Sequence, residues 1–273
     1  MSTKEGISVG ERMKSAPVYF TIAQARFNPI LTLDSFAPRI QEMLRKGGFP
    51  DFQRGVSTTI NLANMTAAPD QGPAQNPLSQ TPRYVFGDAE KTSAFVLEPA
   101  ALSFQTTRYD VFETLLSSFE RGLRAVEEAV NLSYTDRIGL RYLDAVFPKS
   151  GETLGDYLWP GLIGLAEKLE NGALTYAFSE NLVSVQDIHV RVRVVIQDGI
   201  VGFPPDLLPL TLKLDERFVQ LQGCHATMDT DGWCESRQKF SVEQVLEQLG
   251  LIHTEIDKAF RSSVTENALK SWG

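Results

Sequence analysis

The residues in this chain best suited to bind an anion are two arginines that flank a glycine, Arg137, Gly139 and Arg141. Successive side chains of a strand point to opposite faces, so in a strand these three residues share one face. The glycine leaves room for a ligand or another backbone to come close, and two guanidinium groups beside that gap can hold a carboxylate or a phosphate. The alternative is that the arginines pair with acidic neighbours such as Asp136 or Asp144, or with the acidic faces of the helices. The sequence leaves both interpretations open.

A second basic stripe consists of His189, Arg191 and Arg193, which alternate with branched apolar residues between positions 188 and 194. Such alternation predicts a strand with one buried face and one open face. If the sheets that carry the two arginine segments align, the segments form one basic groove; the alternative is an ordinary solvated sheet face. No aromatic residue is interleaved with Arg191 and Arg193, which argues against single-stranded nucleic acid as a ligand.

No catalytic signature stands out in the chain. The three histidines, His189, His225 and His253, lie on separate predicted elements, and no nucleophile elbow, His-Glu-x-x-His helix or phosphate loop occurs. His253 falls at the edge of an apolar helical stripe, which indicates a packed, hydrogen-bonded histidine. The chain is therefore expected to hold no metal or cofactor. A binding function is favoured over an enzymatic one, with an enzyme left open.

The segment Asp229-Thr230-Asp231-Gly232 carries two carboxylates at a spacing that metal sites use, but its composition is more typical of a tight turn. A hairpin at this point separates Cys224 and Cys234 too far for a disulfide. The cysteines also lack the paired C-x-x-C spacing of zinc sites. They are predicted to be ordinary thiols in a reducing compartment.

Two long helices are predicted, and the same pattern of residues leads into each. The pattern is a basic residue, an aromatic residue, a helix-capping residue and valine, at 108–111 and again at 239–242. Asp110 with Glu113, and Ser241 with Gln244, have the capping-box spacing. Apolar residues then recur at helical intervals, so each helix is expected to lie on a sheet. The two stripes are Phe112, Leu115, Leu116, Phe119, Leu123, Val126 and Val130, and Val242, Val245, Leu246, Leu249, Ile252, Ile256 and Phe260.

The repeated pattern predicts an α+β fold with two similar halves, each an antiparallel sheet covered on one face by helices, which implies internal duplication. Residues 1–16 are expected to be a flexible tail, 17–135 the first half and 136–273 the second half. Within the halves, Ala67–Pro82 is interpreted as a mobile loop, Asp198-Gly199 as a tight turn and Leu210–Gln222 as a strand. Whether the halves share one sheet or pack side by side is left open.

Length and charge agree with a cytoplasmic protein. The 273 residues suffice for one large domain or two small ones. No apolar run approaches the ~20 residues of a membrane-spanning helix, and the first residues are polar and carry no secretory signal. Without such a run, no membrane partner is expected. The net charge of −8 repels phosphate backbones, so nucleic acid is not an expected partner either.

Five segments are distinctive in their order and spacing. They are Pro17-Val18-Tyr19-Phe20, Arg137-Ile138-Gly139-Leu140-Arg141-Tyr142-Leu143, Met228-Asp229-Thr230-Asp231-Gly232, Gly250-Leu251-Ile252-His253 and Ser271-Trp272-Gly273. Together they resemble a sporadically distributed family of uncharacterised prokaryotic proteins of about this length, and the central segment is the most specific. No activity or cofactor is established for that family, so the resemblance implies no catalytic residue. Its patchy distribution implies horizontally moved genes, such as defence or mobile-element cassettes.

The sequence therefore predicts a non-enzymatic cytoplasmic accessory protein that binds another protein, with the oligomeric state left open. Trp272 is costly to leave exposed at the chain end. It is expected either to seal the core against the neighbouring half or to anchor a partner. The alternative function is a sensor of a small anionic ligand, bound between the two halves by Arg137, Arg141, Arg191 and Arg193.

Overall fold

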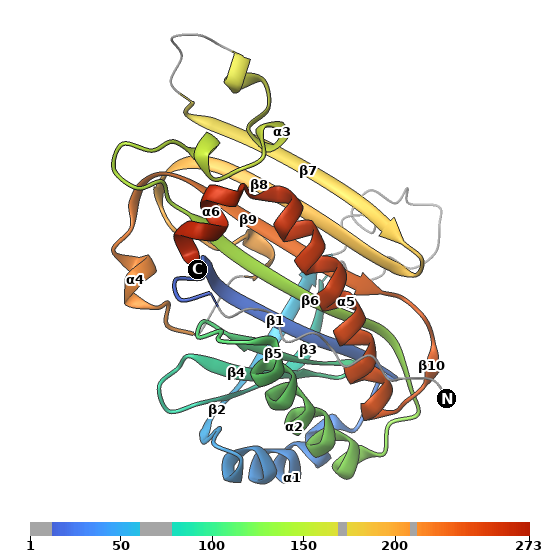
Figure 1. Ribbon diagram of the computed structural model, residues 1–273. Helices are drawn as coiled ribbons and strands as arrows, with labels where there is room; N and C mark the ends of the chain where they lie inside the picture. The colour runs from blue at the N-terminus through green and yellow to red at the C-terminus, as the bar shows by residue number, and fades with distance from the viewer. Residues whose placement is uncertain (1–12, 61–77, 169–173, 208–211) are drawn as a thin grey trace, which may run out of the picture.

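The computed structural model describes residues 13–60, 78–168, 174–207 and 212–273, and within them the chain is α+β (Figure 1). The first elements in chain order are β1 (Val18–Phe27), α1 (Leu33–Lys46), β2 (Asp51–Ile60), β3 (Leu78–Gly87), β4 (Ser93–Glu98), β5 (Ala101–Thr106) and α2 (Phe112–Val130). They are followed by β6 (Tyr134–Val146), α3 (Pro160–Ile163), β7 (Tyr176–Val185), β8 (Ile188–Ile200), α4 (Glu216–Val219), β9 (Gln222–Cys234), β10 (Gln238–Lys239), α5 (Val242–Ser263) and α6 (Glu266–Trp272).

The strands form one antiparallel sheet that runs through both parts of the chain. Its order is β2-β3-β4-β5-β1-β6-β9-β8-β7, and β10 also pairs with β6. The central pair is β1 and β6, which lie antiparallel along most of their length. The sheet is therefore continuous across the predicted boundary near residue 135, rather than divided into two sheets packed side by side.

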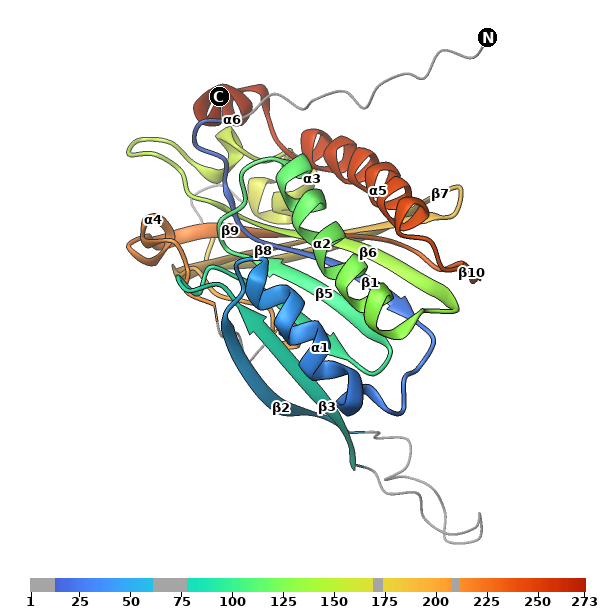
Figure 2. The same ribbon diagram turned by 90° about the horizontal axis from the view of Figure 1, so that it is seen from below.

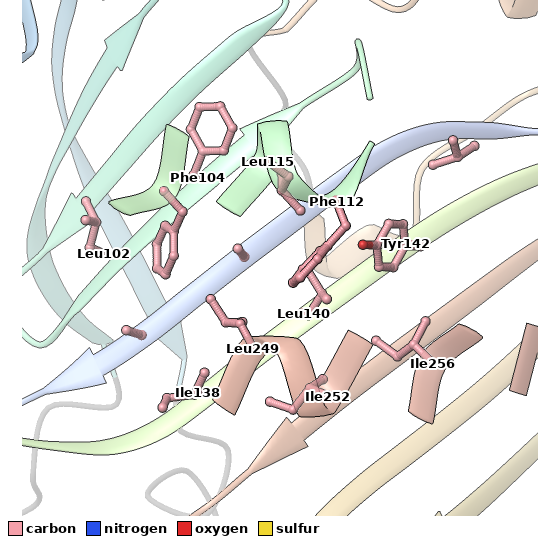
Figure 3. Close-up of a cluster of buried hydrophobic side chains, with 14 of the residues drawn as sticks. Leu102, Phe104, Phe112, Leu115, Ile138, Leu140, Tyr142, Leu249, Ile252 and Ile256 are labelled. Carbon is pink, nitrogen blue, oxygen red and sulfur yellow. The ribbon is translucent and has the colours of Figure 1, made fainter. Parts of the chain in front are cut away.

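The two long helices lie beside each other on one face of the sheet, which we call the helix face (Figure 2). Both predicted stripes are buried against the strands. Leu115 of α2 and Leu249 and Ile252 of α5 meet Ile138 and Leu140 of β6 in the main core (Figure 3). Helix α1 packs beside α2 on the same face. The three helices α1, α2 and α5 thus cover one face of a single sheet.

The two long helices start differently, although the sequences that lead into them match. The side chain of Ser241 caps α5, because its Oγ accepts a hydrogen bond from the backbone N–H of Gln244 at 3.3 Å. The cap predicted at Asp110 is wrong: Val111 is the N-cap residue of α2, and no side-chain cap forms there. The helix begins one residue later than the matching pattern indicates.

The opposite face of the sheet, which we call the far face, is covered at one end by the chain between β8 and β9. Val201 and Phe218 from this segment form a second apolar cluster with Tyr19, Phe20 and Leu143. The remainder of the far face is therefore where polar side chains of the central strands can line an accessible surface.

Three local predictions differ from the structure over the residues that it describes. The end of the predicted loop Ala67–Pro82 belongs to β3, which pairs with β2 from Leu78 onward; residues 67–77 lie outside the described residues. Asp198-Gly199 continues β8, and the chain turns instead after β7, where Gln186 has a φ of 54° without any glycine to signal it. The described part of the predicted strand Leu210–Gln222 contains α4, and β9 starts only at its last residue.

Candidate functional site

Arg141 lies at the centre of a buried ion-pair network on the far face. It is 7% exposed, and its Nε and Nη2 donate to Oδ1 and Oδ2 of Asp229 at 2.7 and 2.8 Å. Its Nη1 also donates to Oδ2 of Asp206 at 2.5 Å. Burial opposes the guanidinium charge, but the bonds to Asp229 and Asp206 outweigh burial and raise the pKa of Arg141 above its ordinary value. Arg141 is thus a fixed cation whose donors are already occupied by carboxylates.

Strand β8 adds two more arginines to this network. Nη2 of Arg193 donates to Oδ2 of Asp229 at 2.6 Å, and Nη2 of Arg191 donates to Oδ2 of Asp231 at 2.8 Å. Asp229 can bind arginines from two directions because β9 lies between β6 and β8. The structure therefore places the two basic segments on one face, on either side of β9, with the aspartates of β9 between them.

The Asp-Thr-Asp-Gly segment was expected to be a turn, and that prediction was wrong. Strand β9 runs unbroken through it. Gly232 serves packing, because a Cβ at this position would lie 2.8 Å from Cγ2 of Ile252 and from Cδ1 of Ile256 in α5. The acidic neighbours suggested for the arginines are also not the ones used: neither Asp136 nor Asp144 forms an ion pair within the described ranges.

Trp233 of β9 joins Arg137 to Arg191. Its ring centroid lies 5.8 Å from the guanidinium carbon of Arg137 and 5.6 Å from that of Arg191, which are cation–π distances. The ring of His189 lies 5.4 Å from Trp233, and its Nδ1 is 2.8 Å from Oγ of Ser184. Trp233 belongs to the neighbouring strand, so no aromatic residue is seen beside Arg191 and Arg193 in the sequence of β8 itself.

A polar groove of about 430 Å³ lies over the far face, and Arg137, Arg141 and Arg191 line it. Arg137 is the least neutralised of the three: its ion pair with Glu235 is loose, at 3.7 Å. Arg83 also lines the groove and forms no ion pair with any described residue. Arg193 and His189 lie outside its wall. The other polar groups of the wall are Gln24, Glu98, Ser103, Gln105, Asp206 and Asp231.

Trp272 lies away from this groove, at the end of α6. It is buried, with the rings of Tyr157 and Phe260 at 5.9 and 6.0 Å. The backbone N–H of Ser15 donates to its carbonyl at 2.9 Å, so the described end of the predicted tail is held here; residues 1–12 lie outside the described residues. Trp272 is thus part of the core, but its ring contacts lie in its own predicted half and not in the neighbouring half as expected. Its burial leaves little of the indole for a partner.

Exposed apolar side chains gather around β7, at the edge of the sheet (Figure 1). Of the thirteen large apolar residues exposed in the described part of the chain, seven lie between positions 159 and 185. The register with β8 puts Tyr176, Phe178 and Leu182 on the far face, the face of Arg191 and Arg193, and Leu182 lies directly opposite Arg191. We call this set the β7 patch: Trp159, Leu165, Tyr176, Phe178, Leu182, Val183 and Val185. Aromatic residues and arginine together are typical of protein interfaces.

Comparisons with protein-family models, curated proteins and solved structures found nothing similar to this chain. Among the described residues, no helix is long and apolar enough to cross a membrane, and no group of His, Cys, Asp and Glu is arranged to hold a metal ion. Cys224 and Cys234 are both free.

Proposed function

We propose that this chain is a non-enzymatic accessory protein that binds another protein along β7. The observation that carries the proposal is the β7 patch, because five large apolar side chains of one edge strand are 41–63% exposed over both of its faces. Monomeric proteins rarely concentrate exposed apolar residues in this way. An unpaired edge also offers backbone N–H and C=O groups to an added strand. The partner is therefore expected to place an extended segment beside β7.

The strand order supports this position for the partner. Counted outward from the centre of the sheet, the strands of the first half are β1, β5, β4 and β3, and those of the second half are β6, β9, β8 and β7. In each half a long helix follows a hairpin in the chain: α2 follows β4 and β5, and α5 follows β8 and β9. This correspondence supports an origin by internal duplication, which we include in the proposal. In it β3 corresponds to β7, and β3 is covered by β2, whereas no described strand pairs with the outer edge of β7. A partner strand would take the place that β2 holds in the first half.

A segment of another protein fits this edge better than a second copy of the chain. Two copies would pair antiparallel about a twofold axis perpendicular to the sheet, so every residue would stay on its own face. Two registers give the longest overlap between the two β7 strands. One places Glu180 opposite Glu180 of the second copy, and the other places it opposite Leu182 of the second copy. Like charges directly opposite destabilise a strand pair. A partner strand with apolar residues near Phe178 and Leu182, and a basic residue opposite Glu180, avoids both arrangements.

The proposal places the protein in the cytoplasm of a prokaryotic cell, as the product of a defence or mobile-element cassette. The support is the resemblance carried by the five segments described above, together with an exposed free thiol at Cys224, which suits a reducing compartment. A partner encoded beside this gene is the expected consequence.

A photo-crosslinking residue at Phe178 or Leu182 is expected to capture one partner protein in the cells that make this chain. These side chains are 53% and 59% exposed on the far-face side of β7. The same residue at Leu251, 50% exposed on α5, is the matched control and is expected to capture nothing specific. Mass spectrometry of the products identifies the partner.

A second substitution separates binding from folding in this experiment. Leu182→Lys in the Phe178 crosslinking variant should abolish capture and leave the unfolding free energy within about 0.5 kcal/mol, because the site is exposed. Equal capture from Leu251 would contradict the proposal. So would a product that consists of two copies of this chain.

The groove favours a second function, a sensor of a small anionic ligand. The specific observation is that Arg83 and Arg137 enter the groove without a close carboxylate, whereas Arg141 and Arg191 are paired with aspartates. The guanidinium of Arg137 lies over Gly139, where a Cβ would come within 3.0 Å of its Nη1. Of the four arginines assigned to this role from the sequence, Arg137 is the one whose charge is available.

Thermal unfolding with added pyrophosphate or nucleotides tests this second function. A ligand of the groove is expected to raise the midpoint by about 3 °C or more at saturating concentration. The double variant Arg83→Ala, Arg137→Ala should lose this shift, and Arg39→Ala, an exposed arginine paired with Glu128, should retain it. An unchanged midpoint in the unmodified chain would remove this function from consideration.

A further inference from the structure

A second cavity, of about 140 Å³, lies on the helix face between the start of α2 and the C-terminal half of α5. Its floor consists of Tyr142 and Asp144 on β6 and Thr230 on β9, which stands directly opposite Tyr142. The segment from Met13 to Val18 closes one side. No residue that lines this cavity also lines the groove of the far face, so the two are independent sites.

Two buried polar groups in the floor lack a protein partner within the described part of the chain. Asp144 is 5% exposed, and its carboxylate forms neither a hydrogen bond nor an ion pair there. Thr230 is 1% exposed, and its Oγ1 has no hydrogen-bond partner. Buried polar groups are normally hydrogen-bonded, and each exception needs an explanation. The floor is therefore suited to a ligand group that donates hydrogen bonds.

The walls around this floor are aromatic. Phe112 of α2 stacks on His253 of α5 with ring centroids 4.0 Å apart, and Nδ1 of His253 is 3.2 Å from the Tyr142 hydroxyl. Tyr109 packs edge-on against Tyr142, with centroids 5.3 Å apart. Figure 3 shows Phe112 beside Tyr142 at this end of the core. These rings provide an apolar surface whose faces also attract cations.

The charges around the cavity are mainly negative. Four carboxylates line it, those of Asp110, Glu113, Asp144 and Asp257, and Arg261 is the basic residue among the described lining groups. Arg261 is already paired with Asp257 at 2.9 Å. An anionic ligand would therefore be repelled, and a purely apolar ligand would leave the floor unsatisfied.

We propose that this cavity binds a small organic amine. The ammonium group pairs with Asp144 and donates a hydrogen bond to Thr230, and the apolar body lies against Tyr109, Phe112 and Tyr142. A protonated amine that carries one ring satisfies the unpartnered acceptors, the aromatic walls and the negative charge together.

Binding is expected to strengthen as the pH rises, because the ammonium group needs Asp144 in its ionised form. Burial, followed by repulsion from Asp229, raises the pKa of Asp144 to about 7. Burial lowers the pKa of His253 below its ordinary value. The titratable and charged groups that face Asp144 are Tyr19, Tyr109, Asp110, Glu113, Tyr142, Asp229, His253, Asp257 and Arg261.

Isothermal titration with phenethylamine tests the proposal, since this amine stays protonated across neutral pH. Saturable binding is expected, roughly tenfold tighter at pH ~8 than at pH ~6. The neutral 2-phenylethanol and the anionic phenylacetate are expected to bind at least about tenfold more weakly. Asp144→Asn should abolish phenethylamine binding, Thr230→Val should weaken it less, and Asp187→Asn, in the β7–β8 turn, should leave it unchanged.

The Asp144→Asn variant is expected to fold. A carboxyl whose pKa is raised on folding contributes stability below its unfolded value of 3.8 and loses that contribution as the pH rises through about 7. The amide cannot ionise, so the thermal midpoint of the variant at pH ~8 should equal or exceed that of the unmodified chain. Unchanged amine binding by the folded variant, equal affinity for 2-phenylethanol, or no saturable binding up to about 10 mM amine would overturn the proposal.

Discussion

Replacing Asp229 with alanine is expected to lower the free energy of unfolding by about 3 to 5 kcal/mol, the usual cost of leaving a buried charge unpaired. The substitution removes the carboxylate that accepts two hydrogen bonds from Arg141 and one from Arg193. Arg141 is buried, so its guanidinium keeps most of its desolvation cost when this partner is lost. Asp206 still accepts a hydrogen bond from Nη1 of Arg141, so the guanidinium keeps one partner. The expected loss of unfolding free energy therefore stays within about 3 to 5 kcal/mol. Urea unfolding measures the change.

Asp257→Ala is the matched control for this experiment. It also breaks an Asp–Arg pair at 2.9 Å, but the side chains of Asp257 and Arg261 are 45% and 43% exposed. Exposed pairs contribute about 0 to 1 kcal/mol, so the control should lose far less stability. A loss below about 1 kcal/mol for Asp229→Ala would mean that the network does not stabilise β6, β9 and β8 as described.

Gly122→Val is expected to cost on the order of 3 kcal/mol, although replacing glycine within a helix normally favours the helix. Helix α2 lies so close to β4 that a Cβ at position 122 would come within 2.3 Å of Cε1 of Phe95. Phe95 cannot move aside easily, because it is buried between Phe49 and Phe104, with ring centroids at 4.7 and 4.9 Å. Thermal and urea unfolding report the loss.

Two further variants identify the clash as the cause. Gly55→Val on β2 is the control, since nothing lies within 4 Å of a Cβ added there. Phe95→Ala should be less destabilising in the Gly122→Val chain than in the unmodified chain, because it removes the ring that clashes. Equal losses at positions 55 and 122, or strictly additive effects of Gly122→Val and Phe95→Ala, would argue against this close contact.

Periodic burial made the long elements predictable from sequence. The apolar stripes of α2 and α5 face the sheet, and the alternation in β8 places Val190, Val192 and Val194 on the helix face. Each of these patterns is set within one element, by which of its faces is buried. The α+β class and the covering of one sheet face by helices follow from the same patterns.

The ion-pair network depends on which strands are neighbours in the sheet, and the sequence does not show this directly. The composition of the segment that carries Asp229 also led to a wrong prediction of a turn. Arg141 and Asp229 are 88 residues apart in sequence, and the Asp-Thr-Asp-Gly segment resembles a turn more than a strand. Strand alternation did offer one usable signal. Asp144 is three residues from Arg141, so the two side chains point to opposite faces of β6 and cannot pair. The same reasoning separates Asp136 from Arg137.

The β7 patch was also missed, because exposure of an edge strand follows from the sheet order and not from local sequence. The adjacent Leu182 and Val183 break the simple alternation, which indicates apolar groups on both faces of the strand. A strand with apolar side chains on both faces is normally covered on both faces. Here the described helices α2 and α5 cover the central strands and leave β7 exposed.

Hydrogen exchange of the chain alone and bound to its captured partner tests the proposed binding edge most directly. If a partner strand adds to the sheet, the amides of Tyr176–Val185 should exchange more slowly in the complex, while those of α2, α5 and β2 keep their rates. Protection that appears at β2 or in the strands below the groove, with the amides of β7 unchanged, would contradict the account.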